Sequence, residues 1–487
     1  KMRNIVRFGV LLGLGSFVLG CGSGNPNDDG GSESENVGRA TFDLAIVPSG
    51  VGCVRITVTG SSSVTKDFTL AASASSATLN MDRLPLGNIT IDGSAYATTC
   101  GTGTTLYVAD TSAAVISPGV VSALSLTFRK DNAVNASVNF VGNVQAISAQ
   151  YNATYALIDG VVYQWGYNTV TNATVSAPTA VTTGTSFVDL NQGFDSQTPC
   201  AIKSDGTLWC WGVNTSGQAG VATPAVVTTP TQVGTDTGYS AVVSGGNHTC
   251  AAEPNSRLVK CWGDNSYGQI GPGPGGSAQV NTLTYASAKS IAAGASHTCA
   301  ITGLLDVRCW GYGYWGQRGD GTQSNTTIPT AILGLTPAKS VTAGANFSCA
   351  LMADGTARCW GYNYDGELGN GSGGNYQLFP VNVSGAYNVS MISAGYTHAC
   401  ALVNDGTVAC WGSNRSGQLG DGTTTNRAYP ATVYGLPDPV VQLSSGSAHT
   451  CAVTKRQDIY CWGDNNYGEL GDGTFYDAVK PVKVKLP

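Results

Sequence analysis

Hydrophobic and polar residues alternate over short segments along the whole chain, and no long helical period occurs. Between residues 400 and 411 the alternation leads into an Asp405-Gly406 turn and out again to Trp411, a pattern typical of a β-hairpin. The pattern recurs about every 50 residues, which indicates a solenoid, an array or a propeller. Each copy ends on a tryptophan, and the seven are Trp165, Trp211, Trp262, Trp310, Trp360, Trp411 and Trp462.

Two cysteines flank the turn in six of the seven copies. Residues placed symmetrically about a hairpin turn lie opposite each other, close enough for a disulfide, so each pair predicts one cross-strand bridge. The first copy has Thr154 and Gln164 where we expect the cysteines, and a bulge in the turn absorbs one extra residue in the third copy. The predicted pairs are Cys200 with Cys210, Cys250 with Cys261, Cys299 with Cys309, Cys349 with Cys359, Cys400 with Cys410, and Cys451 with Cys461.

The chain starts with a predicted export signal. Lys1, Arg3 and Arg7 precede an apolar stretch over 8–19 that is too short to span a membrane comfortably. Residues 18–21 resemble a bacterial lipobox, so we expect residues 1–20 to be a lipoprotein signal peptide and Cys21 to be lipidated. The alternative is an ordinary signal peptide followed by an incidental cysteine. The paired cysteines also favour an oxidising compartment.

Two segments separate this signal from the repeats. Residues 21–38 are polar and acidic, which predicts a flexible tether. Residues 39–131 predict a small β-sandwich of immunoglobulin-like size, in which Cys53 and Cys100 tie strands together. Its seven predicted strands are 41–47, 54–59, 66–70, 77–81, 88–91, 106–108 and 121–128.

The repeats share a specific sequence motif. Copies contain Gly-x-x-His-Thr-Cys-Ala before the hairpin, as at 294–300, and Trp-Gly-x-Asn-x-x-Gly-x-Leu-Gly-Asp-Gly-Thr after it, as at 462–474. They closely resemble the regulator-of-chromosome-condensation repeat, and this resemblance implies an all-β, seven-bladed β-propeller over residues 140–487. The second and third copies depart from the motif after their tryptophans. We also expect residues 481–484 to pair with the first repeat near 144–155 and so close the ring.

Several residue types invite a metal or cofactor interpretation. His248, His297, His398 and His449 share one repeat position two residues before a cysteine, a spacing also found in zinc sites. We favour structural histidines that bond backbone near the propeller axis, because other copies keep both cysteines without a histidine. The repeated Asp-Gly pairs are typical of tight turns rather than calcium loops. We therefore predict no metal and no cofactor.

The loop after each tryptophan varies within a fixed frame. Its changing residues are of the kinds that dominate protein-binding hot spots, and equivalent loops should lie on one face of the disc, although we expect about half of these side chains to pack between blades. A secreted β-lactamase-inhibiting propeller of the same family uses this kind of face. The predicted binding residues are Tyr267, Tyr312, Tyr314, Trp315, Tyr362, Tyr364, Arg415 and Tyr467.

Together these features predict a non-enzymatic binding or scaffold protein, anchored by lipid to the bacterial envelope, at the outer membrane or cell surface. Its expected partner is a protein or another envelope macromolecule. The net charge of −6, without a block of Lys or Arg, argues against nucleic acid. Two alternatives stay open: an envelope enzyme acting on polysaccharide in the propeller mouth, and a structural subunit of a surface fibre or layer.

Overall fold

The computed structural model describes residues 38–44, 53–59, 62–69, 77–84, 87–96, 105–116 and 128–130, and residues 144–486 with gaps at 183–186, 195, 254–257, 274–275 and 285–287. The chain divides into two compact units, Lys1–Asn143 and Val144–Pro487. The predicted signal peptide, Cys21, residues 21–37 of the tether and Cys100 lie outside the described residues and stay predictions, whereas Gly38, the last residue of the predicted tether, is the first residue of β1. No helix within the described ranges is long and apolar enough to cross a membrane.

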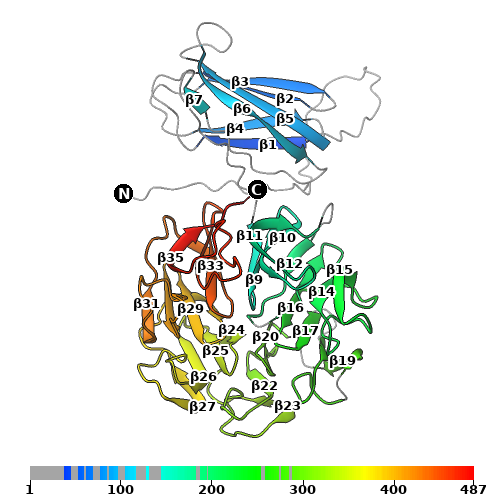
Figure 1. Ribbon diagram of the computed structural model, residues 1–487, viewed down its shortest axis with the longest axis vertical. Coiled ribbons are helices and arrows are strands. Elements are labelled where there is room, and N and C mark those ends of the chain that lie inside the picture. The colour runs from blue at the N-terminus through cyan, green and yellow to red at the C-terminus, as the bar shows by residue number, and fades with distance from the viewer. Residues whose placement is uncertain are drawn as a thin grey trace, which may run out of the picture. The chain divides into compact units, whose positions relative to one another are not determined.

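The first unit contains two antiparallel sheets (Figure 1). One has the order β3-β2-β5-β6-β7, and the other pairs β1 with β4. In β2, Val54, Ile56 and Val58 are buried whereas Thr57 and Thr59 are not, the alternation of a strand with one covered face. The strands are β1 (Gly38–Leu44), β2 (Cys53–Thr59), β3 (Ser63–Thr69), β4 (Ala77–Leu84), β5 (Gly87–Tyr96), β6 (Thr105–Ile116) and β7 (Phe128–Lys130).

Each of the first six predicted strand segments overlaps an observed strand of this unit. The seventh overlaps β7 only at Phe128, because residues 121–127 lie outside the described part of the chain. The packing of the two sheets as an immunoglobulin-like sandwich stays a prediction.

The second unit is a ring of seven four-stranded antiparallel sheets, which confirms the seven-bladed propeller (Figure 1). Each blade uses four consecutive strands, and the first of the four is innermost. Blades 1 to 3 are β8 (Val144–Ala149), β9 (Ala153–Ile158), β10 (Val161–Asn168) and β11 (Ala173–Ala180); β12 (Phe187–Leu190), β13 (Cys200–Lys203), β14 (Leu208–Val213) and β15 (Val226–Gln232); and β16 (Ala241–Ser244), β17 (His248–Glu253), β18 (Leu258–Gly263) and β19 (Gly276–Thr284).

Blades 4 to 7 repeat the same order. They are β20 (Ser290–Ala293), β21 (His297–Ile301), β22 (Val307–Gly311) and β23 (Thr326–Ala331); β24 (Ala338–Ala343), β25 (Phe347–Met352), β26 (Ala357–Asn363) and β27 (Asn375–Asn382); β28 (Val389–Ala394), β29 (His398–Val403), β30 (Val408–Gly412) and β31 (Arg427–Thr432); and β32 (Val440–Ser445), β33 (His449–Thr454), β34 (Ile459–Gly463) and β35 (Ala478–Lys483).

The six predicted disulfides are present, one in the central hairpin of each blade from 2 to 7. They join Cys200 to Cys210, Cys250 to Cys261, Cys299 to Cys309, Cys349 to Cys359, Cys400 to Cys410, and Cys451 to Cys461. The paired cysteines lie directly opposite each other, as Cys400 and Cys410 do, with Cα atoms 4.0 Å apart. All twelve are buried, so each bridge is part of the core between blades. In the first unit Cys53 is a buried disulfide cysteine, and its predicted partner Cys100 is not among the described residues.

The register predicted for the first hairpin is wrong by one residue. Gln164 pairs with Tyr155, and Thr154 pairs with Trp165. The cause is a tight turn in which Asp159 and Gly160 have φ of 50° and 78°, the type I′ geometry of a two-residue loop. Tyr155 therefore takes the place of a cysteine, and its buried ring meets Trp211 edge-on at 6.3 Å.

The predicted ring closure is also wrong. The last strand, β35, pairs with β34 of its own blade and not with the first repeat. The first described strand of the propeller is an inner strand and the last is an outer one. Each of the seven blades therefore has four strands of its own, and no blade takes a strand from another part of the chain. Blade 7 instead packs against blade 1 (red and cyan in Figure 1) through a shared core that includes Trp165 and Val484. Polar contacts add to it: Ala149 N donates to Ser444 Oγ at 2.9 Å.

Candidate interaction site

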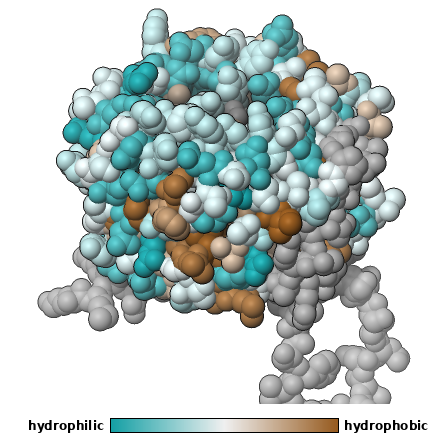
Figure 2. Space-filling view, turned by 90° about the horizontal axis from the view of Figure 1, so that it is seen from below, coloured by the Kyte–Doolittle hydropathy of each residue, from teal (hydrophilic) through white to brown (hydrophobic). Residues whose placement is uncertain are grey.

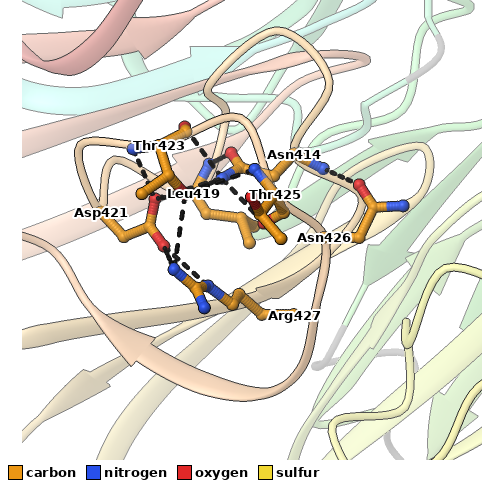
Figure 3. Close-up of polar contacts among 7 residues, drawn as sticks. All are labelled: Asn414, Leu419, Asp421, Thr423, Thr425, Asn426 and Arg427. Atoms are coloured by element: carbon orange, nitrogen blue, oxygen red, sulfur yellow. Dashed lines mark hydrogen bonds and ion pairs between the residues drawn. The ribbon is translucent and has the colours of Figure 1, made fainter.

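The loop between the third and fourth strand of a blade is built around one asparagine. In blade 6, Asn414 Oδ1 accepts from Leu419 N at 3.0 Å, and Asn414 Nδ2 donates to the carbonyl oxygens of Thr423 and Thr425 at 3.0 and 3.1 Å (Figure 3). Asp421 and Arg427 complete the network with an ion pair at 2.8 Å. Because these bonds hold the loop from inside, the next residue is directed outward, and the Arg415 side chain is 78% exposed. Equivalent asparagines are Asn214, Asn265, Asn363 and Asn465.

Blade 4 builds this loop differently. Gly313 takes the place of the asparagine, and a Cβ atom there would lie 2.2 Å from Ser324 O and 2.8 Å from Arg318 Nε. Arg318 takes the place of the buried leucine, and its Nη2 donates to Asp320 Oδ2 at 2.7 Å. A buried ion pair therefore replaces the asparagine–leucine pair beneath Tyr314 and Trp315. The sequence contains this signal, because blade 4 alone combines Gly at the first position with Arg at the second.

In blades 2 to 7 a second buried side chain holds the loop from inside. It is a glutamine in most blades: Gln418 Oε1 accepts from Ser416 N at 3.0 Å. Glu367 and Glu469 replace it in blades 5 and 7, where Oε2 accepts from Asp365 N and from Tyr467 N, both at 2.9 Å. Burial raises the pKa of Glu367 to about 7 and that of Glu469 to about 8. A carboxyl oxygen thus takes the accepting role of the glutamine amide oxygen.

The predicted aromatic residues of blades 3 to 5 lie in one continuous row. We call Tyr267, Tyr312, Tyr314, Trp315, Tyr362, Tyr364 and Tyr376 the aromatic arc. Adjacent ring centroids are separated by 4.7 Å (Tyr267–Tyr312), 6.4 Å (Tyr312–Tyr314), 4.9 Å (Tyr314–Trp315), 5.2 Å (Trp315–Tyr362), 4.8 Å (Tyr362–Tyr364) and 6.2 Å (Trp315–Tyr376). Trp315 is at the centre of the row, in contact with rings of both blade 4 and blade 5.

Sequence reasoning missed one member of the arc. Tyr376 belongs to the outer strand β27, whereas the sequence pattern points only to the loops as carriers of binding residues. The pairing of Tyr376 with Tyr362 across β26 and β27 brings its ring to the arc. Tyr314 is 54% exposed and Tyr364 is 48% exposed, while Tyr312, Trp315 and Tyr362 are half-buried.

The other two predicted residues lie beyond the arc. Arg415 extends it toward blade 6, where its Nη2 is 3.6 Å from Asp365 Oδ1. Tyr467 in blade 7 instead meets Tyr167 of blade 1 at 5.5 Å. The described contacts therefore place six of the eight predicted residues in the arc, Arg415 next to it, and Tyr467 apart from it in a pair with Tyr167.

The loops between first and second strands, on the same face, meet at the propeller axis. Backbone bonds join successive blades there, as from Ala345 N to Tyr396 O at 3.2 Å. The longer loop of blade 2 places Phe194 edge-on to Tyr396 of blade 6, with centroids 5.9 Å apart, and Phe194 is buried. None of the described residues in these seven loops is Asp, Glu, Lys or Arg.

All four histidines are buried at seams, the interfaces between neighbouring blades. They bond a side-chain hydroxyl of the next blade rather than backbone, which corrects that detail of the prediction. His297 Nε2 lies 2.8 Å from Ser348 Oγ, and that hydroxyl donates to Gln317 O at 3.0 Å. Because the hydroxyl hydrogen is used there, Nε2 must donate. Burial lowers the pKa of His297 to about 3, so the ring is neutral. The neighbouring cysteines are in disulfides, and no metal-binding group of three occurs among the described residues.

The seam between blades 5 and 6 uses a different pair. Phe347 of blade 5 occupies the position that His297 occupies in blade 4. Ala399 of blade 6 occupies the position that Ser348, with its hydroxyl, occupies in blade 5. Both are buried, and Trp411 Nε1 still donates to Glu367 O at 2.8 Å. The histidine and the hydroxyl are thus absent together at this seam.

A rim surface offers a second set of exposed apolar residues. Figure 2 shows the molecule from below in Figure 1, with small hydrophobic patches between hydrophilic and neutral residues. Exposed apolar side chains of outer strands include Ile328 on β23, Phe379 on β27 and Tyr429 on β31. No ring contact among the described residues joins them to the aromatic arc, so they form a separate set.

The fold and the loop face define a repeat protein of the β-propeller class, with an aromatic surface on one side of the ring. The regulator of chromosome condensation (RCC1) repeat matches residues 205–252, 307–351, 354–402, 405–453 and 458–487, and a second RCC1 repeat profile matches 239–269, 338–367, 389–418 and 440–469. The chain therefore belongs to the RCC1 repeat family.

Known proteins similar to this chain include the ultraviolet-B receptor UVR8 of Arabidopsis thaliana, 30% identical over 49% of this chain and 56% of UVR8. The human E3 ubiquitin-protein ligase HERC2 is 35% identical over 19% of this chain but only 2% of its own length. The chain thus spans about half of UVR8 and a small part of HERC2. Among solved structures, yeast RCC1 (Prp20) bound to Kap60 has a TM-score of 0.59 at 20% identity, covering 73% of this chain and 90% of the other. Human WBSCR16 has a TM-score of 0.59 at 23% identity, covering 64% and 85%.

Proposed function

We propose that this protein is a lipid-anchored, non-enzymatic binding protein of the bacterial cell envelope, whose propeller holds a partner protein on the aromatic arc. The observation behind the proposal is the continuous row of tyrosine rings around Trp315, part of it exposed, on loops held rigidly from inside. Rigid aromatic side chains give a large contact area at a small entropic cost, which is why they dominate binding hot spots.

The relatives agree with a protein-binding role. The yeast RCC1 structure contains Kap60, and another structure of yeast Prp20p is described with binding properties to Gsp1p and histones. The envelope location is supported by the lipobox-like segment before Cys21 and by six disulfides, which persist where thiols are not kept reduced.

Crosslinking in the native cells tests the binding surface. Alanine at Tyr314, Trp315 and Tyr364 should abolish one crosslinked species that the wild-type protein forms. The control replaces three exposed aromatic residues outside the arc, Tyr387, Tyr429 and Tyr434, and should keep that species. Unchanged crosslinking in the arc variant, or equal loss in both variants, would refute the role of the arc.

The anchor has its own test. Cys21→Ser should release the protein from the membrane fraction and prevent incorporation of a radiolabelled fatty acid. Because the residue lies far from the propeller in sequence, the unfolding transition of the released protein should be unchanged. Membrane retention with no labelled lipid in the wild-type protein would contradict lipid anchoring.

A further inference from the structure

The two faces of the propeller differ in how their charges are matched. The loop face, formed by loops between first and second and between third and fourth strands, has three arginines in its third-to-fourth-strand loops and at the start of β31. Each is paired: Arg318 with Asp320 at 2.7 Å, Arg415 with Asp365 at 3.6 Å and Arg427 with Asp421 at 2.8 Å. Four further carboxylates of these loops form no ion pair among the described residues, and they are Asp264, Asp464, Asp472 and Asp477.

The opposite face is closer to balance. There Arg308, Arg456 and Lys483 pair with Asp306, Asp438 and Asp458. Lys289, Lys339 and Lys455 form no ion pair within the described part of the chain, and neither do Asp205, Asp354 and Asp405 in the hairpin turns of that face. Unmatched negative charge is thus more pronounced on the face that bears the aromatic arc. A cationic partner is drawn more strongly to this face than to the opposite one.

Aromatic rings and carboxylates also alternate locally. Asp264 precedes Tyr267 by three residues in blade 3, and Asp464 precedes Tyr467 at the equivalent position in blade 7. Asp264 receives only neutral donors, such as Ser266 Oγ at 2.6 Å and Gln269 Nε2 at 2.8 Å. Asp264 therefore places a carboxylate without a cationic partner in the same loop as Tyr267, the first member of the arc.

The arrangement of the rings favours a cation over a sugar. Tyr312 and Tyr314 are nearly parallel at 17°, and so are Tyr362 and Tyr364 at 29°. Trp315 meets rings on both sides at 83° to 88° and is half-buried, so it offers no free flat platform for a sugar ring. Exposed tyrosine faces beside carboxylates are the surroundings in which guanidinium and ammonium groups bind through cation–π contacts.

We propose that the aromatic arc binds a cationic, extended segment of a protein partner, with arginine or lysine side chains lying against the tyrosine faces of blades 3 to 5. This inference rests on the proposed function and specifies the chemistry of the partner. The row runs across three blades, so an extended segment contacts it along its length, and the carboxylates of this face set the sign of charge that it accepts.

Peptide binding to the full chain tests the inference. The probes are fluorescein-labelled peptides of about 12 residues with alternating arginine and serine, and matched peptides with citrulline or glutamate in place of arginine, at about 50 and 200 mM salt. A β-1,4-linked glucose hexasaccharide represents the other class of ligand. Fluorescence anisotropy should show binding of the arginine peptide that weakens as salt rises, with citrulline at least about tenfold weaker and glutamate not bound.

Variants then locate the site. The double change Tyr314→Ala and Tyr364→Ala should weaken the arginine peptide about five- to tenfold, and Asp264→Asn about threefold, whereas Tyr429→Ala should have no effect. Equal binding of the arginine and citrulline peptides, absence of peptide binding up to about 1 mM, or binding of the hexasaccharide in its place would each overturn the inference. The crosslinking result is independent: loss of the crosslinked species in the arc variant would still support the proposed function.

Discussion

The seam between blades 4 and 5 allows a test of how neighbouring blades recognise each other. His297→Phe removes the Nε2 donor from Ser348 Oγ, which then keeps its bond to Gln317 O and its 3.7 Å contact with Cys299 Sγ. The ring itself should fit, because Phe347 fills the equivalent space at the next seam and is fully buried there. The Phe347–Ala399 pair thus already has the arrangement that His297→Phe together with Ser348→Ala would create.

The expected magnitudes follow from the hydrogen bonds. His297→Phe removes one buried bond and leaves Ser348 Oγ without that donor, whereas Ser348→Ala removes two buried bonds and leaves His297 Nε2 without its acceptor. Each single change should cost about 1–3 kcal/mol. The double variant leaves no such group, because Gln317 O still accepts from Trp360 Nε1 at 2.9 Å, as Glu367 O accepts from Trp411. The double variant should therefore be more stable than the sum of the single changes predicts, by about 1 kcal/mol.

Urea unfolding at neutral pH, with the disulfides intact and followed by far-ultraviolet circular dichroism, measures the four proteins of this cycle. The control applies Ser348→Ala and Tyr429→Ala, whose sites share no contact among those described and should give additive effects. Strict additivity of His297→Phe and Ser348→Ala, or a double variant less stable than that sum, would refute the idea that a phenylalanine–alanine pair can replace the histidine–hydroxyl pair at this seam.

Three further predictions concern buried ionisable groups. Burial lowers the pKa of His398 to about 3, so between its unfolded pKa and about 3 the unfolded state binds more protons, and stability should decrease as the pH is lowered through that window. The double change His398→Phe with Thr450→Ala should therefore flatten the acid side of a profile of melting temperature against pH, and an unchanged profile would contradict this reasoning. The raised pKa of Glu469, about 8, has the opposite sign: the unfolded carboxyl ionises first, so stability falls as pH rises from about 4.5 to 8, and Glu469→Gln should be more stable by at least about 2 kcal/mol at pH 9 but nearly equal at pH 4. A stability difference that does not change with pH would argue against it. Arg318→Leu leaves Asp320 buried without its cation and should lower the free energy of unfolding in urea by about 3 kcal/mol. Arg415→Leu, at an exposed pair, should lower it by less than about 0.5 kcal/mol. Equal losses would exclude a stabilising role for the buried pair.

The sequence by itself determined the repeat, the hairpin in each copy and the six disulfides. These features depend on contacts close in the chain: Cys400 and Cys410 face each other because a turn of known length lies between them. Even the error in the first hairpin was local, since Asp159 and Gly160 form a shorter turn than Asp405 and Gly406 do. Strand pairing across a turn is governed by residue spacing, and spacing can be counted.

Only the tertiary structure decided what happens between blades. It gave each histidine a hydroxyl of the next blade, and it brought Tyr376 against Trp315 in the aromatic arc while Tyr467 paired with Tyr167. These partners are far apart in sequence, and their contact depends on how whole sheets are turned and packed around the axis. Residue spacing carries no information about that packing, whereas buried volume and the partners of buried polar groups determine it.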